Sequence, residues 1–264
     1  MKRLLTAIFT LLLLPVLFPA AGGFAGAEKP EVPFRVIMPV DDWPPYRVVS
    51  NGTMHGLDFD LMKELTERVP FRVKYQATPW NRSLVQMQQG KVDAMTGLAR
   101  RPERELFIYY IEPPYSVCST VFYVPGGKGS SIRTYEDLRG KRLGFVLGSA
   151  YFPQFDQDQA LGKIGVATEE QLIKMTLAGR LDVFVGTDCQ VDYELVSQGL
   201  TDKLEKATFR PGNKVDLYFG VSRYSLFFGY VEELERVMRQ MKQDGTLQRI
   251  NESYFSPAGK RKRQ

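Results

Sequence analysis

The sequence predicts an α/β protein of two lobes, each a mostly parallel sheet flanked by helices, with a ligand cleft between the lobes. Segments with strand and helix patterns alternate from residue 34 to residue 97, which is typical of such sheets. The alternation starts again after the glycine-rich loop at 126–131 and ends in a helical segment near the C-terminus. These observations favour a chain that builds one lobe, crosses to a second lobe and returns.

The first part of the chain carries three expected strands and two expected helices. The strands are predicted at 34–38, 71–75 and 92–97, where β-branched and aromatic residues gather. The helices are predicted at 57–69 and 80–89, and the second of them ends at Gly90. In the first helix, Leu57, Leu61 and Leu65 recur every four residues and form one apolar face.

The rest of the chain repeats this alternation. Strands are predicted at 119–125, 142–147, 181–185 and 217–221. Thr168 and Gln171 have the spacing of a capping box, which predicts a helix from there to about Ala178. The last helix is predicted at 227–242, with its end at Asp244-Gly245.

These elements set the expected domain boundaries. Residues 28–117 and 213–256 are expected to form the first lobe, and residues 118–212 the second. The chain would cross between the lobes near 116–120 and return near 208–216. A cleft between two lobes is a natural ligand site, because it can close around a small molecule by hinge motion.

The N-terminus has the pattern of an export signal. Two basic residues precede an apolar run at 4–18, and Ala25-Gly26-Ala27 fits a cleavage site. A membrane anchor left in place is the alternative, but an anchor needs about 20 apolar residues, and this run is shorter and contains Pro15. We therefore expect residues 1–27 to be a signal peptide and the mature protein to be free in the periplasm.

The net charge of +5 is concentrated at the two ends of the chain. Lys2 and Arg3 lie in the leader, and Lys260-Arg261-Lys262-Arg263 lies in a basic tail at 257–264. The remaining body is close to neutral and has no basic face with interleaved aromatic residues, so we expect no nucleic-acid partner. The tail is interpreted as a solubilising end, with contact to an anionic surface as the alternative.

Cysteine and histidine are scarce. An oxidising compartment permits a disulfide between Cys118 and Cys189, and two buried free thiols are the alternative. His55 is the only histidine, so we expect no metal site and no cofactor. A Ser-His-Asp or Cys-His catalytic set would depend on His55 as its base.

An ordered set of short motifs runs through the mature chain. The motifs are Trp43-Pro44-Pro45-Tyr46, Gly56-Leu57-Asp58-Phe59-Asp60-Leu61, Gly90-Lys91-Val92-Asp93-Ala94, Pro102-Glu103-Arg104, Pro114-Tyr115, the segment 137–144, Gly148-Ser149, Asp244-Gly245-Thr246 and Tyr254-Phe255. In this order they resemble the family 3 extracellular solute-binding proteins, which include amino-acid receptors of ABC transporters. The resemblance implies the type II periplasmic-binding-protein fold.

The resemblance also implies a carboxylate clamp. Arg104 matches the arginine that grips the ligand's carboxylate, because a guanidinium can bind a carboxylate through two parallel hydrogen bonds. Arg100 and Arg101 are competitors for this role, and a surface salt bridge is the structural alternative. Arg82 could add a second positive contact or could face solvent.

Two tryptophans and one loop complete the implied site. Trp43 matches the ring that covers the ligand and Trp80 matches a side-chain pocket residue, although either could instead be a core residue. Gly148 and Ser149 match a loop whose N–H groups and hydroxyl cradle an anionic group, and the alternative is an ordinary tight turn.

The sequence also departs from the family pattern. Amino-acid receptors carry an acidic residue five positions after the aspartate matched by Asp182, and this residue pairs with the ligand's ammonium group. Position 187 is threonine here, and Asp188 comes one residue late, so only a bulge would bring it into register. The segment 97–101 departs as well. Its arginines would suit an anionic solute, whereas Asp41 and Asp42 could favour a cationic group.

The function expected from the resemblance is capture of a small polar, carboxylate-bearing solute by hinge closure. The receptor would act as a monomer and deliver the solute to the membrane permease of an ABC transporter. One alternative is a dehydratase-like enzyme on the same fold, for which Glu112, Asp188 and His55 are the candidate acids and bases. The other alternative is a receptor for a membrane signalling partner.

Overall fold

The computed structural model describes residues 34–50 and 52–255. The signal peptide expected at 1–27 and the basic tail expected at 257–264 lie outside these residues. Within the described part, no helix combines the length and the apolar character needed to cross a bilayer.

The first elements follow the predicted alternation. Strands β1 (Phe34–Val40) and β4 (Phe71–Ala77) pair in parallel, from Phe34 with Phe71 to Val40 with Ala77. Between them lie a short hairpin, β2 (Val48–Ser50) and β3 (Thr53–His55), and helix α1 (Leu57–Arg68). Helix α2 (Trp80–Gln88) and strand β5 (Ala94–Ala99) come next, so the strands and helices predicted for this part are confirmed.

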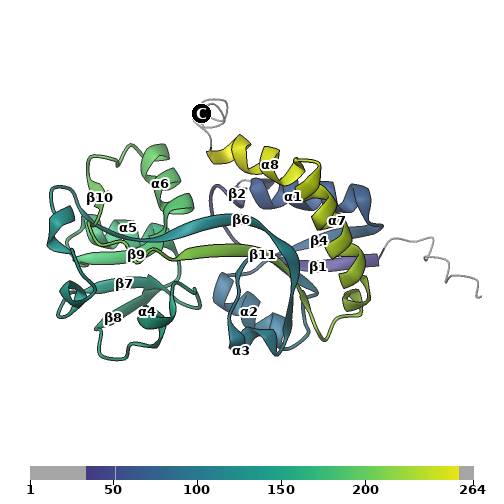
Figure 1. Ribbon diagram of the computed structural model, residues 1–264, viewed down its shortest axis with the longest axis horizontal. Coiled ribbons are helices and arrows are strands. Elements are labelled where there is room, and N and C mark those ends of the chain that lie inside the picture. The colour runs from purple at the N-terminus through teal and green to yellow at the C-terminus, as the bar shows by residue number, and fades with distance from the viewer. Residues whose placement is uncertain (1–33, 51, 256–264) are drawn as a thin grey trace, which may run out of the picture. The chain divides into compact units, whose positions relative to one another are not determined.

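Two strands run through a larger sheet of seven strands. Strand β6 (Ile108–Pro125) and strand β11 (Lys214–Ser222) are antiparallel neighbours in its centre (Figure 1). Strand β5 lies beside β11 at one end, and β9 (Val183–Thr187), β7 (Leu143–Val146) and β8 (Lys163–Val166) follow β6 at the other. Strand β10 (Leu204–Lys206) also pairs with β6.

The α/β class is confirmed, but the sheets are more mixed than the predicted parallel arrangement. The pairs β1–β4, β7–β8 and β7–β9 are parallel. Every pair formed by β6 or β11 is antiparallel, because these strands carry the chain out and back past the same region.

The strands bury both of their faces, so each part of the sheet separates two apolar clusters. In β6, Phe122 and Val124 belong to one cluster, whereas Val121 and Tyr123 belong to another on the opposite face. Near the start of β6, Ile111 packs with β1, α1 and the last helices, while Ile108 packs with α2 and β5. The alternation follows from the two-residue period of a strand. Helices therefore cover both faces, as the α/β class requires.

The remaining helices cap these clusters. They are α3 (Pro102–Glu105), α4 (Pro153–Gln157), α5 (Glu169–Leu177), α6 (Asp188–Ser197), α7 (Val231–Gln243) and α8 (Thr246–Phe255), with single 3₁₀ turns at Gly129–Ser131, Glu136–Leu138 and Leu226–Tyr230. The Thr168 hydroxyl accepts the N–H of Gln171, which confirms the predicted cap of α5. The chain does not end its helical part at Gly245, where φ is +77°, because α8 begins directly after it.

A disulfide lies where β6 and β11 pass each other. Cys118 is bonded to Cys189, the second residue of α6, so the disulfide is present and the alternative of two free thiols is wrong. Cys118 pairs with Val215 across the two strands, and Ser116 pairs with Leu217. The bond therefore joins α6 to the segment in which the chain was predicted to cross between lobes.

Candidate functional site

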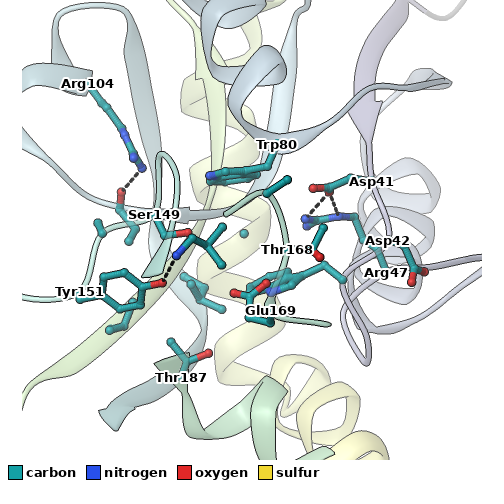
Figure 2. A pocket seen from close by; sticks show the side chains of 18 residues that line it. Asp41, Asp42, Arg47, Trp80, Arg104, Ser149, Tyr151, Thr168, Glu169 and Thr187 are labelled. Carbon is teal, nitrogen blue, oxygen red and sulfur yellow. Dashed lines mark hydrogen bonds and ion pairs between the residues drawn. The ribbon is translucent and has the colours of Figure 1, made fainter. Parts of the chain in front are cut away.

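A small cavity gathers side chains from the start and the middle of the chain. Its volume is about 60 Å³, well below the 300–1,000 Å³ typical of ligand pockets. It is lined by Asp41, Asp42, Trp43, Arg47, Trp80, Gly97, Ala99, Arg104, Val146, Ser149, Ala150, Tyr151, Ala167, Thr168, Glu169, Thr187, Val215 and Leu217. Figure 2 shows Arg104 on one side, the Asp41–Arg47 pair on the other and Trp80 between them in the view.

Arg104 supplies a buried positive charge to this cavity. Its side chain comes from the one-turn helix α3, and the residue is only 5% exposed. Among the residues that the structure describes, its hydrogen bonds go to the carbonyl oxygens of Ala99 and Gly148, and none goes to a carboxylate. Burial lowers the pKa of the Arg104 guanidinium below its usual value. A guanidinium has five N–H donors, so this group can still bind an anion.

Arg47 is also buried, but its charge is already neutralised. Its guanidinium donates to Asp41 at 2.8 Å and to Asp58 at 2.6 Å, and it lies over the Trp43 ring at 4.9 Å. Burial alone would lower the pKa of Arg47, but the two carboxylates outweigh burial and raise it. Asp58 also accepts the hydroxyl of Tyr115 at 2.7 Å. Arg47 therefore holds the wall in place rather than offering a free charge.

Gly97 makes room for that wall. Its φ is +74°, and a Cβ there would lie 2.9 Å from Cζ3 of Trp43 and 3.0 Å from Nη1 of Arg47. The position thus needs a residue that is small and that tolerates a left-handed backbone, and glycine meets both needs.

A polar chain links Trp43 to a buried acid on α6. The indole Nε1 of Trp43 donates to Oε1 of Gln190 at 2.5 Å, and Nε2 of Gln190 donates to Oε1 of Glu194 at 2.8 Å. Gln190 and Glu194 are 2% and 4% exposed. The Oε2 atom of Glu194 is buried and has no hydrogen-bond partner among residues 34–50 and 52–255. Burial, with Glu169 nearby, raises the pKa of Glu194 to about 7.

Glu169 is a second glutamate with a raised pKa, and it lines the cavity directly. It is the first residue of α5 and is half-buried. Burial raises the pKa of Glu169 to about 7, with Gln190 and the helix backbone lowering it and Asp41 raising it further. Among the described residues, no lysine or arginine forms an ion pair with Glu169, whereas the adjacent Glu170 pairs with Lys174 at 2.5 Å.

The loop after β7 faces Arg104 across the cavity. Gly148 accepts a hydrogen bond from Arg104 through its carbonyl group, and Ser149 accepts one from Arg101 at 3.1 Å. Arg101 also pairs with Asp156 at 2.7 Å. Gly148 has a φ of +76°, and a Cβ there would lie 3.0 Å from Oδ1 of Asn81 on α2. These contacts tie residues 80–104 to residues 148–156.

A wider recess continues from the cavity. Its volume is 730 Å³, and it shares Ala99, Ala150, Tyr151 and Val215 with the cavity. The Arg101–Asp156 pair lies among its lining residues.

The structure brings together five of the eight predicted binding residues. Arg104, Trp43, Trp80, Ser149 and Asp42 line the cavity. Gly148 takes part through its carbonyl group instead of its N–H, because that carbonyl accepts from Arg104.

Two predicted binding residues lie away from the cavity. Arg82 is exposed on α2, since two residues past Trp80 a helix has turned to its other face. Asp188 begins α6, and its Oδ1 accepts the N–H of Ser119 at 2.7 Å, so no bulge turns it toward the solute. Asp188 lies close to Cys118 and Cys189, but those sulfurs are bonded to each other and are not metal ligands.

The candidate acids and bases of the enzyme alternative also lie elsewhere. Glu112 pairs with Arg100 at 2.6 Å, His55 is exposed in the β2–β3 hairpin, and neither is a lining residue. Sequence reasoning missed Arg47, Thr168 and Glu169. The capping box at Thr168 was a usable signal for Glu169, because a helix N-terminus beside a strand end often faces a ligand.

Comparison with known proteins identifies the family of this chain. The model of the bacterial extracellular solute-binding proteins, family 3, matches residues 36–257. The chain belongs to this family. The chain is 22% identical over 222 residues to the probable amino-acid-binding protein YxeM of Bacillus subtilis (strain 168), with 80% of each protein covered.

Two solved structures show the same fold. An ancestral arginine-binding protein bound to arginine superposes with a TM-score of 0.72 at 21% identity, covering 85% of this chain and 100% of that one. The ancestral amino-acid-binding protein AncCDT-1, a precursor of cyclohexadienyl dehydratase, gives a TM-score of 0.71 at 20% identity, covering 85% and 96%. The two-lobed periplasmic-binding-protein fold that the sequence predicted is thus confirmed.

Proposed function

We propose that this family 3 solute-binding protein captures a small carboxylate-bearing solute in the periplasm and delivers it to the permease of an ABC transporter. The observation that carries the proposal is Arg104. Within the described part of the chain, its guanidinium is buried and forms hydrogen bonds only to carbonyl groups. A buried charge without an ion-pair partner is poorly stabilised, and a carboxylate would supply that partner. The amino-acid-binding relatives support the same class of solute.

Closure around a hinge is part of the proposal. The cavity is too small for an amino acid to enter without separation of its walls. We place the hinge where the crossing near 116–120 and the return near 208–216 run side by side, since Cys118 of β6 pairs with Val215 of β11. Residues 28–117 and 213–256 then form one lobe, and residues 118–212 form the other. The hydrogen bond from Arg104 to Gly148 and the Arg101–Asp156 pair would then open and close with the solute. Scattering profiles that are identical with and without a bound acid would contradict this hinge.

The experiment that tests the function is thermal unfolding of the mature protein, stripped of carried-over ligand, with a panel of solutes. The panel contains amino acids, dicarboxylates, sugars and polyamines. A solute at 100 times its Kd adds about 2.7 kcal/mol to the free energy of unfolding, which raises the midpoint by roughly 5–10 °C for a chain of this size. We expect only carboxylates to do this. Stabilisation by sugars or polyamines alone would contradict the proposal.

One observation favours a second candidate, dehydration of a small carboxylic acid. Glu169 lines the cavity with its pKa raised to about 7, which suits a general acid at neutral pH. Such an acid would protonate a leaving hydroxyl group, which departs as water while the ring carboxylate departs as carbon dioxide, and the electrons of the broken carbon–carbon bond complete the aromatic ring. The test is incubation of the protein with a cyclohexadienyl carboxylic acid while the absorbance of an aromatic product is followed. Turnover that is lost in Glu169→Gln would favour the enzyme, and a bound but unaltered acid would favour the receptor.

A further inference from the structure

The two ends of the cavity carry opposite charge. Arg104 lies at one end, and Asp41, Asp42 and Glu169 are the lining acids, with Arg47 as the other lining cation. Because Arg47 is held by Asp41 and by the buried Asp58, its charge is cancelled inside the wall. Asp41 and Arg47 lie close enough to Glu169 to shift its pKa in opposite directions. The cavity is therefore bipolar (Figure 2).

The acidic residue that the family resemblance leads us to expect at position 187 is replaced by threonine in this chain. Thr187 ends β9 and lines the cavity, but a hydroxyl cannot balance a positive charge. Asp188 follows it and holds the N–H of Ser119 instead. Glu169 enters the same cavity from the neighbouring helix α5.

We propose that Glu169, with Asp41 as a second carboxylate, receives a positively charged nitrogen group of the solute at the opposite end of the cavity from Arg104. The solute is then a bipolar acid that carries an ammonium or guanidinium group. This inference rests on the proposed function, because it takes Arg104 as the partner of the solute's carboxylate.

The surroundings of Glu169 fit a carboxyl that loses its proton more readily when a cation arrives. Asp41 and Arg47 face it from the segment after β1, and Glu194 faces it from α6. Gln190 lies between the two glutamates, and its amide orientation is fixed by the N–H of Trp43. With negative groups on two sides and burial, Glu169 gains its proton readily, and a bound cation would displace that proton.

The test uses four acids with the same carbon skeleton. Caproate carries no cation, and ε-aminocaproate carries a distal ammonium group. L-norleucine carries an α-ammonium group, and L-lysine carries both. Calorimetric titration of each acid into the mature protein gives its Kd. We expect at least one cationic acid to bind about tenfold or more tightly than caproate, and the member that gains shows which ammonium Glu169 receives. Equal affinity for all four would overturn the inference and leave the proposed function standing.

Two variants test whether Glu169 pairs with the charge of the solute or only supports the structure of the cavity wall. In Glu169→Gln the advantage of the cationic acids over caproate should vanish while caproate binding stays within about twofold. Glu170→Gln is the matched control, because Glu170 is exposed and, within the described part of the chain, its ion pair is with Lys174. A retained advantage in Glu169→Gln would overturn the inference.

Proton release gives an independent readout. Titrations at pH 6.5 in two buffers with different ionisation enthalpies report the protons released on binding. The wild-type protein and Glu170→Gln should release protons with a cationic acid, and Glu169→Gln should release markedly fewer. Equal release by all three proteins would also overturn the inference. If no carboxylate binds to any of the proteins, the proposed function fails and the inference fails with it.

Discussion

Gly97 offers a sharp test of how the cavity wall is built. The substitution Gly97→Ala adds a methyl group 2.9 Å from the Trp43 ring and 3.0 Å from the Arg47 guanidinium, at a φ of +74°. A left-handed backbone costs about 1–2 kcal/mol for an L-residue, and overpacking of a close-fitting site costs about 1–3 kcal/mol more. We therefore expect Gly97→Ala to lose about 2–5 kcal/mol of stability.

Gly140→Ala is the matched control for the cost of placing an alanine in a left-handed backbone conformation. Its φ is +71°, but a Cβ there meets nothing within 4 Å. This variant should lose only the left-handed cost, about 1–2 kcal/mol. Thermal unfolding measures both losses, at about 2–4 °C for each kcal/mol in a chain of this size.

The affinity for the solute separates the two variants further. Gly97→Ala displaces Trp43, so its Kd for the most stabilising acid of the panel should rise by about tenfold or more, whereas Gly140→Ala should keep the wild-type Kd. If the two variants had equal midpoints and equal affinities, the close contact of Gly97 with Trp43 and Arg47 would not matter, and this description of the wall would be refuted.

Two further predictions concern stability. The Cys118–Cys189 bond closes a loop with a sequence separation of 71, so the double variant Cys118→Ser, Cys189→Ser should lose about 2–4 kcal/mol in guanidinium unfolding; an unchanged midpoint would contradict this. The second concerns Glu194, whose pKa is raised from 4.5 to about 7 by burial. A raised carboxyl pKa means that the folded state binds the proton more tightly than the unfolded state, so stability falls as pH rises from about 4.5 to 7. Glu194→Gln should therefore raise the unfolding temperature more at pH 8 than at pH 5, relative to the wild-type protein at the same pH. An equal effect at both pH values would contradict the burial of an unpaired carboxylate.

Local patterns predicted most of the fold. The strands β1, β4 and β7 and the helices α1, α2 and α5 lie where alternation, helical spacing and the Thr168 cap placed them. Helix α8 was missed although Leu247, Ile250 and Tyr254 have helical spacing, because Asp244-Gly245 was taken as the end of the helical part.

Two other elements were harder to predict for physical reasons. Helix α6 turns Gln190 and Glu194 into the interior, and these polar residues interrupt the apolar face by which a helix is recognised. Strand β6 begins at Ile108, eleven residues before the predicted start, because Pro113 and Pro114 argue against a strand. The register shift of β11 between Leu217 and Phe219 lies opposite these prolines and accommodates them.

The site was predictable where a family motif carried it. The motifs pointed to Arg104, Trp43, Trp80 and Ser149, and all four line the cavity. Their roles toward a solute stay predictions. Glu169 could not be found in this way, since its role depends on which helix terminus packs against the cavity and on the carboxylates around it. Those are properties of the tertiary structure.

The central claim is that Arg104 binds the solute's carboxylate, and titration of two arginine variants tests it most directly. Arg104→Ala should weaken binding of the most stabilising acid by about two orders of magnitude or more, because it removes the buried charge that pairs with the carboxylate. Arg82→Ala, which changes an exposed residue outside the cavity, should bind that acid as the wild-type protein does. Unchanged affinity in Arg104→Ala would contradict the claim.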